Sequence, residues 1–124
     1  MARILLADDD ALQGTLQKRL LEAMGYTVDV ARSPVETVRR VEQGGADLII
    51  MDLRFPNANG LQDAAEGLAL IRTIRQAGCG LPVIVVSGWP DELYGAPEEQ
   101  MVSRVMVKPV PLAALRQTIS ELVG

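Results

Sequence analysis

The sequence contains no histidine, one cysteine and few aromatic side chains. Without histidine, Ser-His and Cys-His nucleophile activation and every His-based metal site are excluded. The single Cys79 excludes an internal disulfide and fits a reducing cytoplasm. Any metal would therefore be held by oxygen atoms, which favours Mg²⁺, Ca²⁺ or Mn²⁺.

Long hydrophobic runs and an excess of positive charge are also missing. No apolar run approaches the roughly 20 residues of a membrane span, and the sequence does not open with the basic-then-apolar pattern of a secretion signal. We therefore expect a cytoplasmic protein without membrane contact. The net charge of −4 disfavours direct nucleic-acid binding, because that binding relies on Lys and Arg to neutralise phosphates.

The composition predicts one ordinary folded domain. Hydrophobic residues make up 48% of the chain although aromatics make up only 3%, so Val, Ile, Leu, Ala and Met must supply the core. A length of 124 residues is near the common size of a single domain. Neither a linker nor an internal repeat is present, so we expect one domain over residues 1–124.

Short apolar runs alternate with helical patterns along the chain. The expected strands are residues 3–7, 27–31, 48–51, 83–86 and 105–107. The expected helices are residues 11–24, 34–43, a third that starts between 62 and 67 and ends near 78, and 111–123. This alternation predicts a doubly wound α/β fold around a five-stranded parallel sheet, and continuous apolar strands indicate that both sheet faces are covered.

Four of these strands end on polar, chemically capable residues. They are Asp8 with Asp9, then Asp52, Ser87 and Lys108. In an open parallel sheet, ligands bind at the carboxyl ends of the strands, so these groups should gather at one edge. Two carboxylates about 4 Å apart repel by roughly 4 kcal/mol at an effective dielectric near 20, so a proton or a cation must compensate.

An all-oxygen site of this kind suits Mg²⁺, which keeps several waters and also binds phosphate oxygens. Mg²⁺ would neutralise an incoming phosphoryl group and align it for attack. A carboxylate can be the nucleophile and form an acyl phosphate. The hydroxyl of Ser87 and the ammonium of Lys108 would then bind the remaining phosphoryl oxygens.

Four sequence stretches at these strand ends complete a recognisable pattern. They are ILLADDD at residues 4–10, DLIIMDLRFP at 47–56, PVIVVSG at 82–88 and VKP at 107–109. In this order and spacing, the chain resembles the receiver domain of two-component response regulators over essentially its whole length. The resemblance implies a flavodoxin-like strand order of 2-1-3-4-5 with helices on both faces.

The resemblance also implies a role for each site residue. Asp52 would be the phosphorylation site, and Lys108, whose peptide bond to Pro109 would be cis, would pair with the phosphoryl group. Asp9 would bind Mg²⁺ directly together with Asp52 and the backbone carbonyl of Arg54, and Asp8 mainly through water. Ser87 would hydrogen-bond the phosphoryl group and draw its loop inward.

The same resemblance implies a signalling module that is not a conventional enzyme. It would take phosphate from a histidine kinase or phosphotransfer protein and catalyse its own phosphorylation and dephosphorylation. With no second domain, output would pass by contact with an unknown downstream protein. A free-standing regulator and a receiver cut from a hybrid kinase both fit, as a monomer or weak homodimer.

The segment 60–68 is longer than the family's pattern. The Gly-Leu step into the third helix matches either Gly60-Leu61 or Gly67-Leu68, which are seven residues apart in the sequence. A longer helix or a surface loop would explain the extension, and the alternative is a modified lid or partner surface beside Asp52.

The fourth crossover and the residue three positions before Lys108 also depart from the family's pattern. Glycine and proline break residues 88–102 into short pieces, which predicts a shortened or irregular fourth helix. Val105 stands where many receivers place Tyr or Phe as a rotamer switch, so coupling would use backbone movement or another side chain, such as Trp89 or Tyr94. In receivers the positions of Arg54 and Trp89 flank the phosphoryl group, and a bulky Trp89 would slow its hydrolysis.

Two other functions compete with this reading. A haloacid-dehalogenase-like phosphatase also uses an Asp nucleophile with Mg²⁺, Ser or Thr, and Lys. It normally carries an acid/base Asp two residues after the nucleophile, where this chain has Arg54, and its nucleophile lies on the first motif. The second alternative is a pseudo-receiver scaffold that is never phosphorylated.

Overall fold

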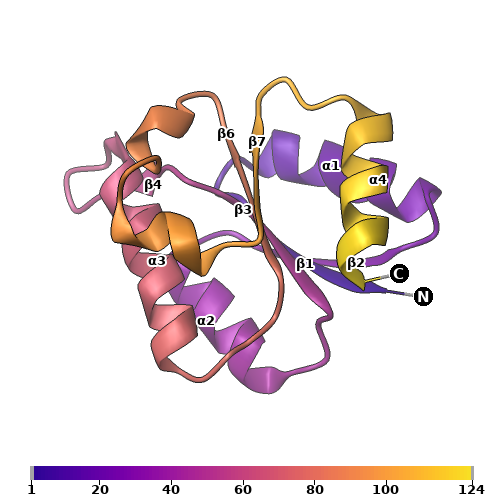
Figure 1. Cartoon of the computed structure of the whole chain (residues 1–124), viewed down its shortest axis with the longest axis horizontal. Coiled ribbons are helices and arrows are strands. Elements are labelled where there is room, and N and C mark those ends of the chain that lie inside the picture. The colour runs from indigo at the N-terminus through magenta and orange to yellow at the C-terminus, as the bar shows by residue number, and fades with distance from the viewer. Residues whose placement is uncertain (1, 124) are drawn as a thin grey trace.

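The computed structural model describes residues 2–123, which form a five-stranded parallel sheet between two layers of helices (Figure 1). The strands of this sheet are β1 (Arg3–Ala7), β2 (Thr27–Ala31), β3 (Leu48–Asp52), β6 (Val83–Ser87) and β7 (Arg104–Val107). The helices are α1 (Ala11–Ala23), α2 (Pro34–Gln43), α3 (Ala64–Gln76) and α4 (Leu112–Val123). The strand order is β2-β1-β3-β6-β7, so the predicted order 2-1-3-4-5 is confirmed.

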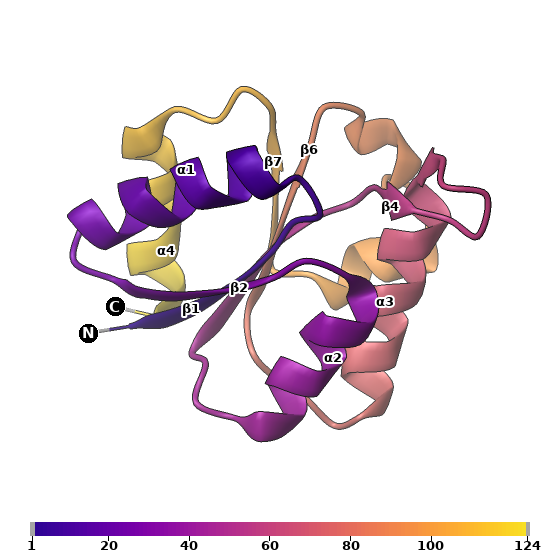
Figure 2. The ribbon, with the colours of Figure 1, turned by 180° about the vertical axis from the view of Figure 1, so that it is seen from behind.

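Different helix pairs cover the two faces of the sheet (Figures 1 and 2). On one face, Leu5 and Ile49 pack in a buried cluster with Ile71 of α3. On the other face, Ile4 packs in a second cluster with Leu115 of α4 and with residues of α1. Successive strand residues point to opposite faces, so a fully apolar strand serves both clusters. The prediction that both faces are covered is confirmed.

The leucine stripe of α1 lies on the surface. Leu12, Leu16 and Leu20 are 73%, 53% and 44% exposed, whereas Leu21 is buried. A helix that turns one apolar stripe to the core usually shows polar residues on its other face. In α1 the exposed leucines are therefore an unused apolar surface.

The extension after β3 forms a small hairpin. Strands β4 (Phe55–Pro56) and β5 (Gln62–Asp63) pair in antiparallel fashion. The turn is built on Asn57, whose backbone N–H donates to the carbonyl of Leu61 at 2.8 Å and whose Oδ1 accepts from the N–H of Leu61 at 3.1 Å. Asp63 caps α3 by accepting from the N–H of Ala65 at 2.9 Å. Residues 55–63 thus form a structured surface hairpin, and α3 begins directly after it at Ala64.

The Gly-Leu step that enters α3 lies at Gly67-Leu68. A Cβ at position 67 would overlap the backbone carbonyl of Leu53, so glycine lets the helix lie directly against the segment that follows β3. Gly60 lies instead in the hairpin turn with φ 77° and has open space around it. The close approach of α3 to the segment after β3 therefore requires a glycine at position 67 and not at position 60.

The fourth crossover contains two short 3-10 helices, η1 (Pro90–Glu92) and η2 (Pro97–Met101), separated by Gly95 with φ 83°. The predicted irregular fourth helix is confirmed. The guanidinium of Arg75 donates to the backbone carbonyls of Met101, Cys79 and Leu81 at 2.7–2.9 Å. The end of η2 is thereby fastened to α3.

None of the helices described between residues 2 and 123 has the length and apolar character needed to cross a membrane.

Candidate functional site

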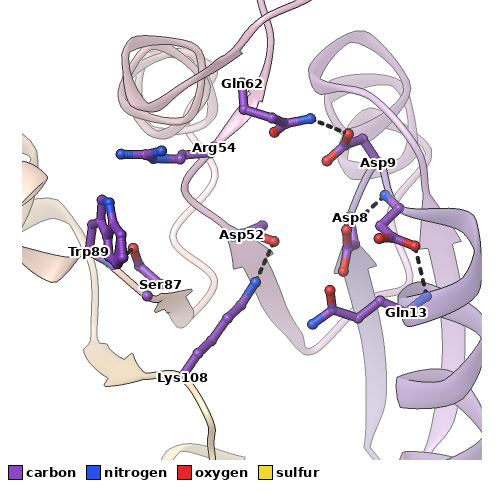
Figure 3. A pocket seen from close by; sticks show the side chains of 11 residues that line it. Asp8, Asp9, Gln13, Asp52, Arg54, Gln62, Ser87, Trp89 and Lys108 are labelled. Carbon is purple, nitrogen blue, oxygen red and sulfur yellow. Dashed lines mark hydrogen bonds and ion pairs between the residues drawn. The ribbon is translucent and has the colours of Figure 1, made fainter.

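The strand-end groups meet in one cleft of about 500 Å³ at the carboxyl edge of the sheet (Figure 3). The residues that line it are Asp8, Asp9, Asp10, Gln13, Asp52, Arg54, Gln62, Ser87, Gly88, Trp89 and Lys108. Each of the site residues expected from the sequence is among them. The fold therefore brings together groups that are up to 100 positions apart in the chain.

Asp52 and Lys108 form an ion pair in the cleft. Asp52 is the last residue of β3 and Lys108 follows β7, and the lysine Nζ lies 2.8 Å from Oδ2 of Asp52. The backbone N–H of Leu53 donates to Oδ1 of Asp52 at 3.1 Å. The side chains of Asp52 and Lys108 are 18% and 30% exposed, so the Asp52 carboxylate is held in place and remains open to the cleft. The Lys108-Pro109 peptide is cis, as the resemblance implies.

Asp8 is the buried carboxylate of the cleft, at 3% exposure. Burial raises the pKa of Asp8 to about 6, and the negative charges of Asp52 and Asp9 add to this effect. The backbone N–H of Asp10, which donates to Oδ1 of Asp8 at 2.9 Å, and the charge of Lys108 oppose it. A single lysine therefore does not compensate the carboxylates, and the site favours a proton or a further cation.

The oxygen donors of the cleft fit Mg²⁺ in kind. Asp8, Asp9 and Asp52 supply carboxylates, and the cleft has space for water. Across residues 2–123, no three His, Cys, Asp or Glu side chains lie close enough together to hold a metal ion by themselves.

Ser87 ends β6 and is 3% exposed. Its Oγ accepts from the backbone N–H of Trp89 at 3.0 Å, and its carbonyl accepts from the backbone N–H of Lys108 at 3.0 Å. A hydroxyl that accepts one bond can still donate its own proton. Ser87 is thereby fixed beside the acceptor with a donor for an incoming oxyanion.

An ion pair that the sequence did not reveal joins the segment after β3 to η1. Nε of Arg54 donates to Oε1 of Glu92 at 2.8 Å, and its guanidinium carbon lies 5.7 Å from the ring centroid of Trp89. The hydrogen bond that Arg54 donates to Glu92 is the main reason why the pKa of Arg54 is raised. Glu92 lies in the irregular crossover, where periodicity carries no signal for side-chain direction.

A second unpredicted contact joins the hairpin to the acidic end of the cleft. Nε2 of Gln62 donates to Oδ2 of Asp9 at 2.8 Å (Figure 3). A turn was readable in residues 57–60, which are Asn-Ala-Asn-Gly. The reach of Gln62 across the cleft was not readable, because it depends on how the hairpin lies over the sheet edge.

The family of response regulator receiver domains matches residues 4–120. The chain therefore belongs to the response regulator receiver domain family. It is a receiver in phosphorelay signalling, and nothing in the matches supports the haloacid-dehalogenase-like phosphatase or the unphosphorylated scaffold.

Known relatives and solved structures agree with this membership. The chain is 34% identical over 123 residues to the transcriptional regulatory protein GlrR of Escherichia coli K12, covering 97% of this chain and 26% of GlrR. It is 31% identical over 78 residues to probable histidine kinase 1 of Oryza sativa subsp. indica, covering 63% of this chain and 8% of that protein. The chain thus spans about a quarter or less of the length of these relatives.

The fold is shared with TrrA of Thermotoga maritima, solved in complex with Mg²⁺-BeF, at a TM-score of 0.84 and 24% identity, with 98% of this chain and 99% of that chain covered. A chain in the complex of histidine kinase ThkA with TrrA gives a TM-score of 0.83 at 23% identity, and both chains are fully covered. A receiver domain from Methylobacillus flagellatus gives 0.84 at 22% identity, with 98% of each chain covered.

Proposed function

We propose that Asp52 is the phospho-acceptor of this receiver domain. The observation that carries the proposal is the ion pair between Asp52 and Lys108, which fixes one oxygen of a partly exposed carboxylate in the cleft. The donor would be a phosphohistidine of a histidine kinase or phosphotransfer protein, since relatives include histidine kinases and a solved neighbour is a kinase complex.

The transfer forms one bond and breaks one. An oxygen of Asp52 attacks the phosphorus, the P–N bond to the donor imidazole breaks, and its electron pair stays on the nitrogen, which then takes up a proton. The ammonium of Lys108 moves from the Asp52 carboxylate to pair with the phosphoryl oxygens, and the hydroxyl of Ser87 donates a hydrogen bond to one of these oxygens. In the reverse phase, water attacks the phosphorus and the bond to Asp52 breaks, which releases inorganic phosphate.

Bound Mg²⁺ would neutralise the charge of the phosphoryl oxygens and align the group for in-line transfer. Asp9, Asp52 and the backbone carbonyl of Arg54 would hold the ion directly, and Asp8 mainly through water. The donor chemistry of the cleft supports this assignment, because the carboxylates of Asp8, Asp9 and Asp52 all line it.

The test is the mass of the protein after treatment with Mg²⁺ and acetyl phosphate. We expect a gain of about 80 Da that is lost in Asp52→Asn and kept in Asp29→Asn. Asp29→Asn is the matched control, because Asp29 of β2 also pairs with a basic residue, Arg3 of β1. If acetyl phosphate gives no gain, a phosphorylated kinase domain is the second donor. No gain from either donor, or a gain that persists in Asp52→Asn, would contradict the assignment.

The exposed leucines of α1 are the surface that we propose for the kinase. Beside the cleft, a groove of about 430 Å³ runs between α1 and the start of α4, and Gln13 and Lys108 line both. A phosphohistidine that reaches Asp52 brings its own helix against this groove. Leu20 is the exposed leucine of α1 that lines this groove. Leu20→Glu should therefore slow transfer from a phosphorylated kinase but not from acetyl phosphate, whereas Val35→Glu, also exposed but on α2, should change neither.

A further inference from the structure

We propose that the β4–β5 hairpin is a latch on the metal site, in which Gln62 holds Asp9 turned toward the hairpin and must release it when Mg²⁺ binds. The inference rests on the proposed role of Asp9 as a direct Mg²⁺ ligand. It gives a function to the extension at residues 60–68, which the phosphorylation chemistry leaves unused.

The first support is the geometry at Asp9. The carboxylate of Asp9 is turned toward Gln62, whose amide donates to Oδ2 at 2.8 Å (Figure 3). Asp8, Asp9, Asp52 and Gln62 line the same cleft. Oδ2 of Asp9 is therefore engaged by a side chain of the hairpin at the edge of the expected metal site.

The second support is the rigidity of the hairpin that carries Gln62. Phe55 at its base is fully buried, and the turn is closed by the side chain and backbone of Asn57. Asp63, the next residue, accepts from the side chain of Asn57 at 3.2 Å and caps α3. Because these contacts do not involve Asp9, they hold Gln62 at the edge of the cleft whether or not Asp9 is engaged.

The consequence is a competition for one carboxylate. A hydrogen bond to a charged group has a net worth that must be given up if the carboxylate turns to another partner. Mg²⁺ therefore binds more weakly than it would to a free Asp9, and its binding releases Gln62.

The test compares Mg²⁺ affinity, measured by titration calorimetry, in the full chain and in Gln62→Met, which keeps the length of the side chain and removes the donor. We expect Gln62→Met to bind Mg²⁺ about three- to tenfold more tightly. Leu61→Ala is the matched control, because Leu61 is the adjacent exposed hairpin residue and its substitution leaves the amide of Gln62 in place. If Gln62→Met folds poorly, Gln62→Asn, which is one methylene too short, should show the same direction.

A second readout reports on the bond itself. In ¹⁵N-labelled protein, the side-chain amide of Gln62, assigned by its absence from Gln62→Met, should lose its hydrogen-bonded chemical shift as Mg²⁺ saturates the site. Equal or weaker affinity in Gln62→Met, or an amide shift that Mg²⁺ leaves unchanged, would overturn the latch alone. Absence of Mg²⁺ binding in every variant would overturn the proposed metal site and the latch with it.

Discussion

Arg54 and Glu92 form an ion pair at 2.8 Å that connects the segment after β3 with η1. The pair spans 38 positions of sequence and adjoins the ring of Trp89. It is therefore a direct physical link between the acceptor side of the cleft and the irregular crossover.

The first prediction concerns the strength of this pair. Both side chains are about a third exposed, and such pairs contribute little to stability. A double-mutant cycle of Arg54→Ala and Glu92→Ala, measured by urea unfolding, should give a small favourable coupling energy, as exposed ion pairs do. The coupling should fall as salt is added. A coupling that is insensitive to salt would show that the two residues interact by another means.

The second prediction concerns Trp89. Its ring lines the cleft and is 58% exposed, so it can limit the approach of water to a phosphoryl group on Asp52. Trp89→Ala should shorten the phosphoryl lifetime several-fold, as measured by loss of radiolabelled phosphate. Tyr94→Ala is the control, because Tyr94 is an exposed aromatic of the same crossover that does not line the cleft. An unchanged lifetime in Trp89→Ala would remove this role.

The third prediction follows from the pKa of Asp8, which burial raises from 3.8 to about 6. The folded state binds a proton more readily than the unfolded state, so the free energy of unfolding falls as pH rises from about 4 to 6 and stays reduced above that range. Without Mg²⁺ at pH 7.5, Asp8→Asn should therefore be more stable than the wild type by about 1–3 kcal/mol. Below pH 4 this advantage should vanish.

Urea unfolding in the presence of a chelator measures this difference. Added Mg²⁺ should stabilise the wild type more than Asp8→Asn, since a ligand that binds only the folded state raises its stability. If Asp8→Asn proves less stable than the wild type at pH 7.5 without metal, the ionised Asp8 carboxylate does not destabilise the folded state, and the prediction is wrong.

The fourth prediction concerns Gly67. A Cβ at this position overlaps the backbone of Leu53, and neither β3 nor α3 can shift without disturbing the core. Gly67→Ala should therefore lower the free energy of unfolding by about 2 kcal/mol or more. Gly80→Ala, where a Cβ meets nothing within 4 Å, should change it by less than about 0.5 kcal/mol. Equal effects at the two positions would contradict the close packing.

The sheet and the centre of the cleft were predictable because both depend on local signals. The change from apolar residues to Asp52, Ser87 or Lys108 marks the end of each strand in the sequence. A parallel sheet then brings those ends together. The family membership and strand order follow from the same pattern.

The contacts made by Gln62 and Glu92 were not predictable, because each depends on the three-dimensional path of an irregular segment. The choice between Gly60 and Gly67 also needed the structure, since only the packing of α3 on Leu53 distinguishes them. The leucine stripe of α1 shows the related limit of periodicity. It indicates an apolar face, but burial depends on what lies opposite, and Leu12 and Leu16 remain exposed.

The division of the fourth crossover determines how far a disturbance at Asp52 can travel. A continuous helix moves as a rod, so a push at one end displaces the other. Here Gly95, with φ 83°, separates two short turns, and Arg75 fastens the second turn to α3. We therefore expect a displacement that begins at Ser87 to move η1 more than η2, so that a partner would detect it close to Trp89.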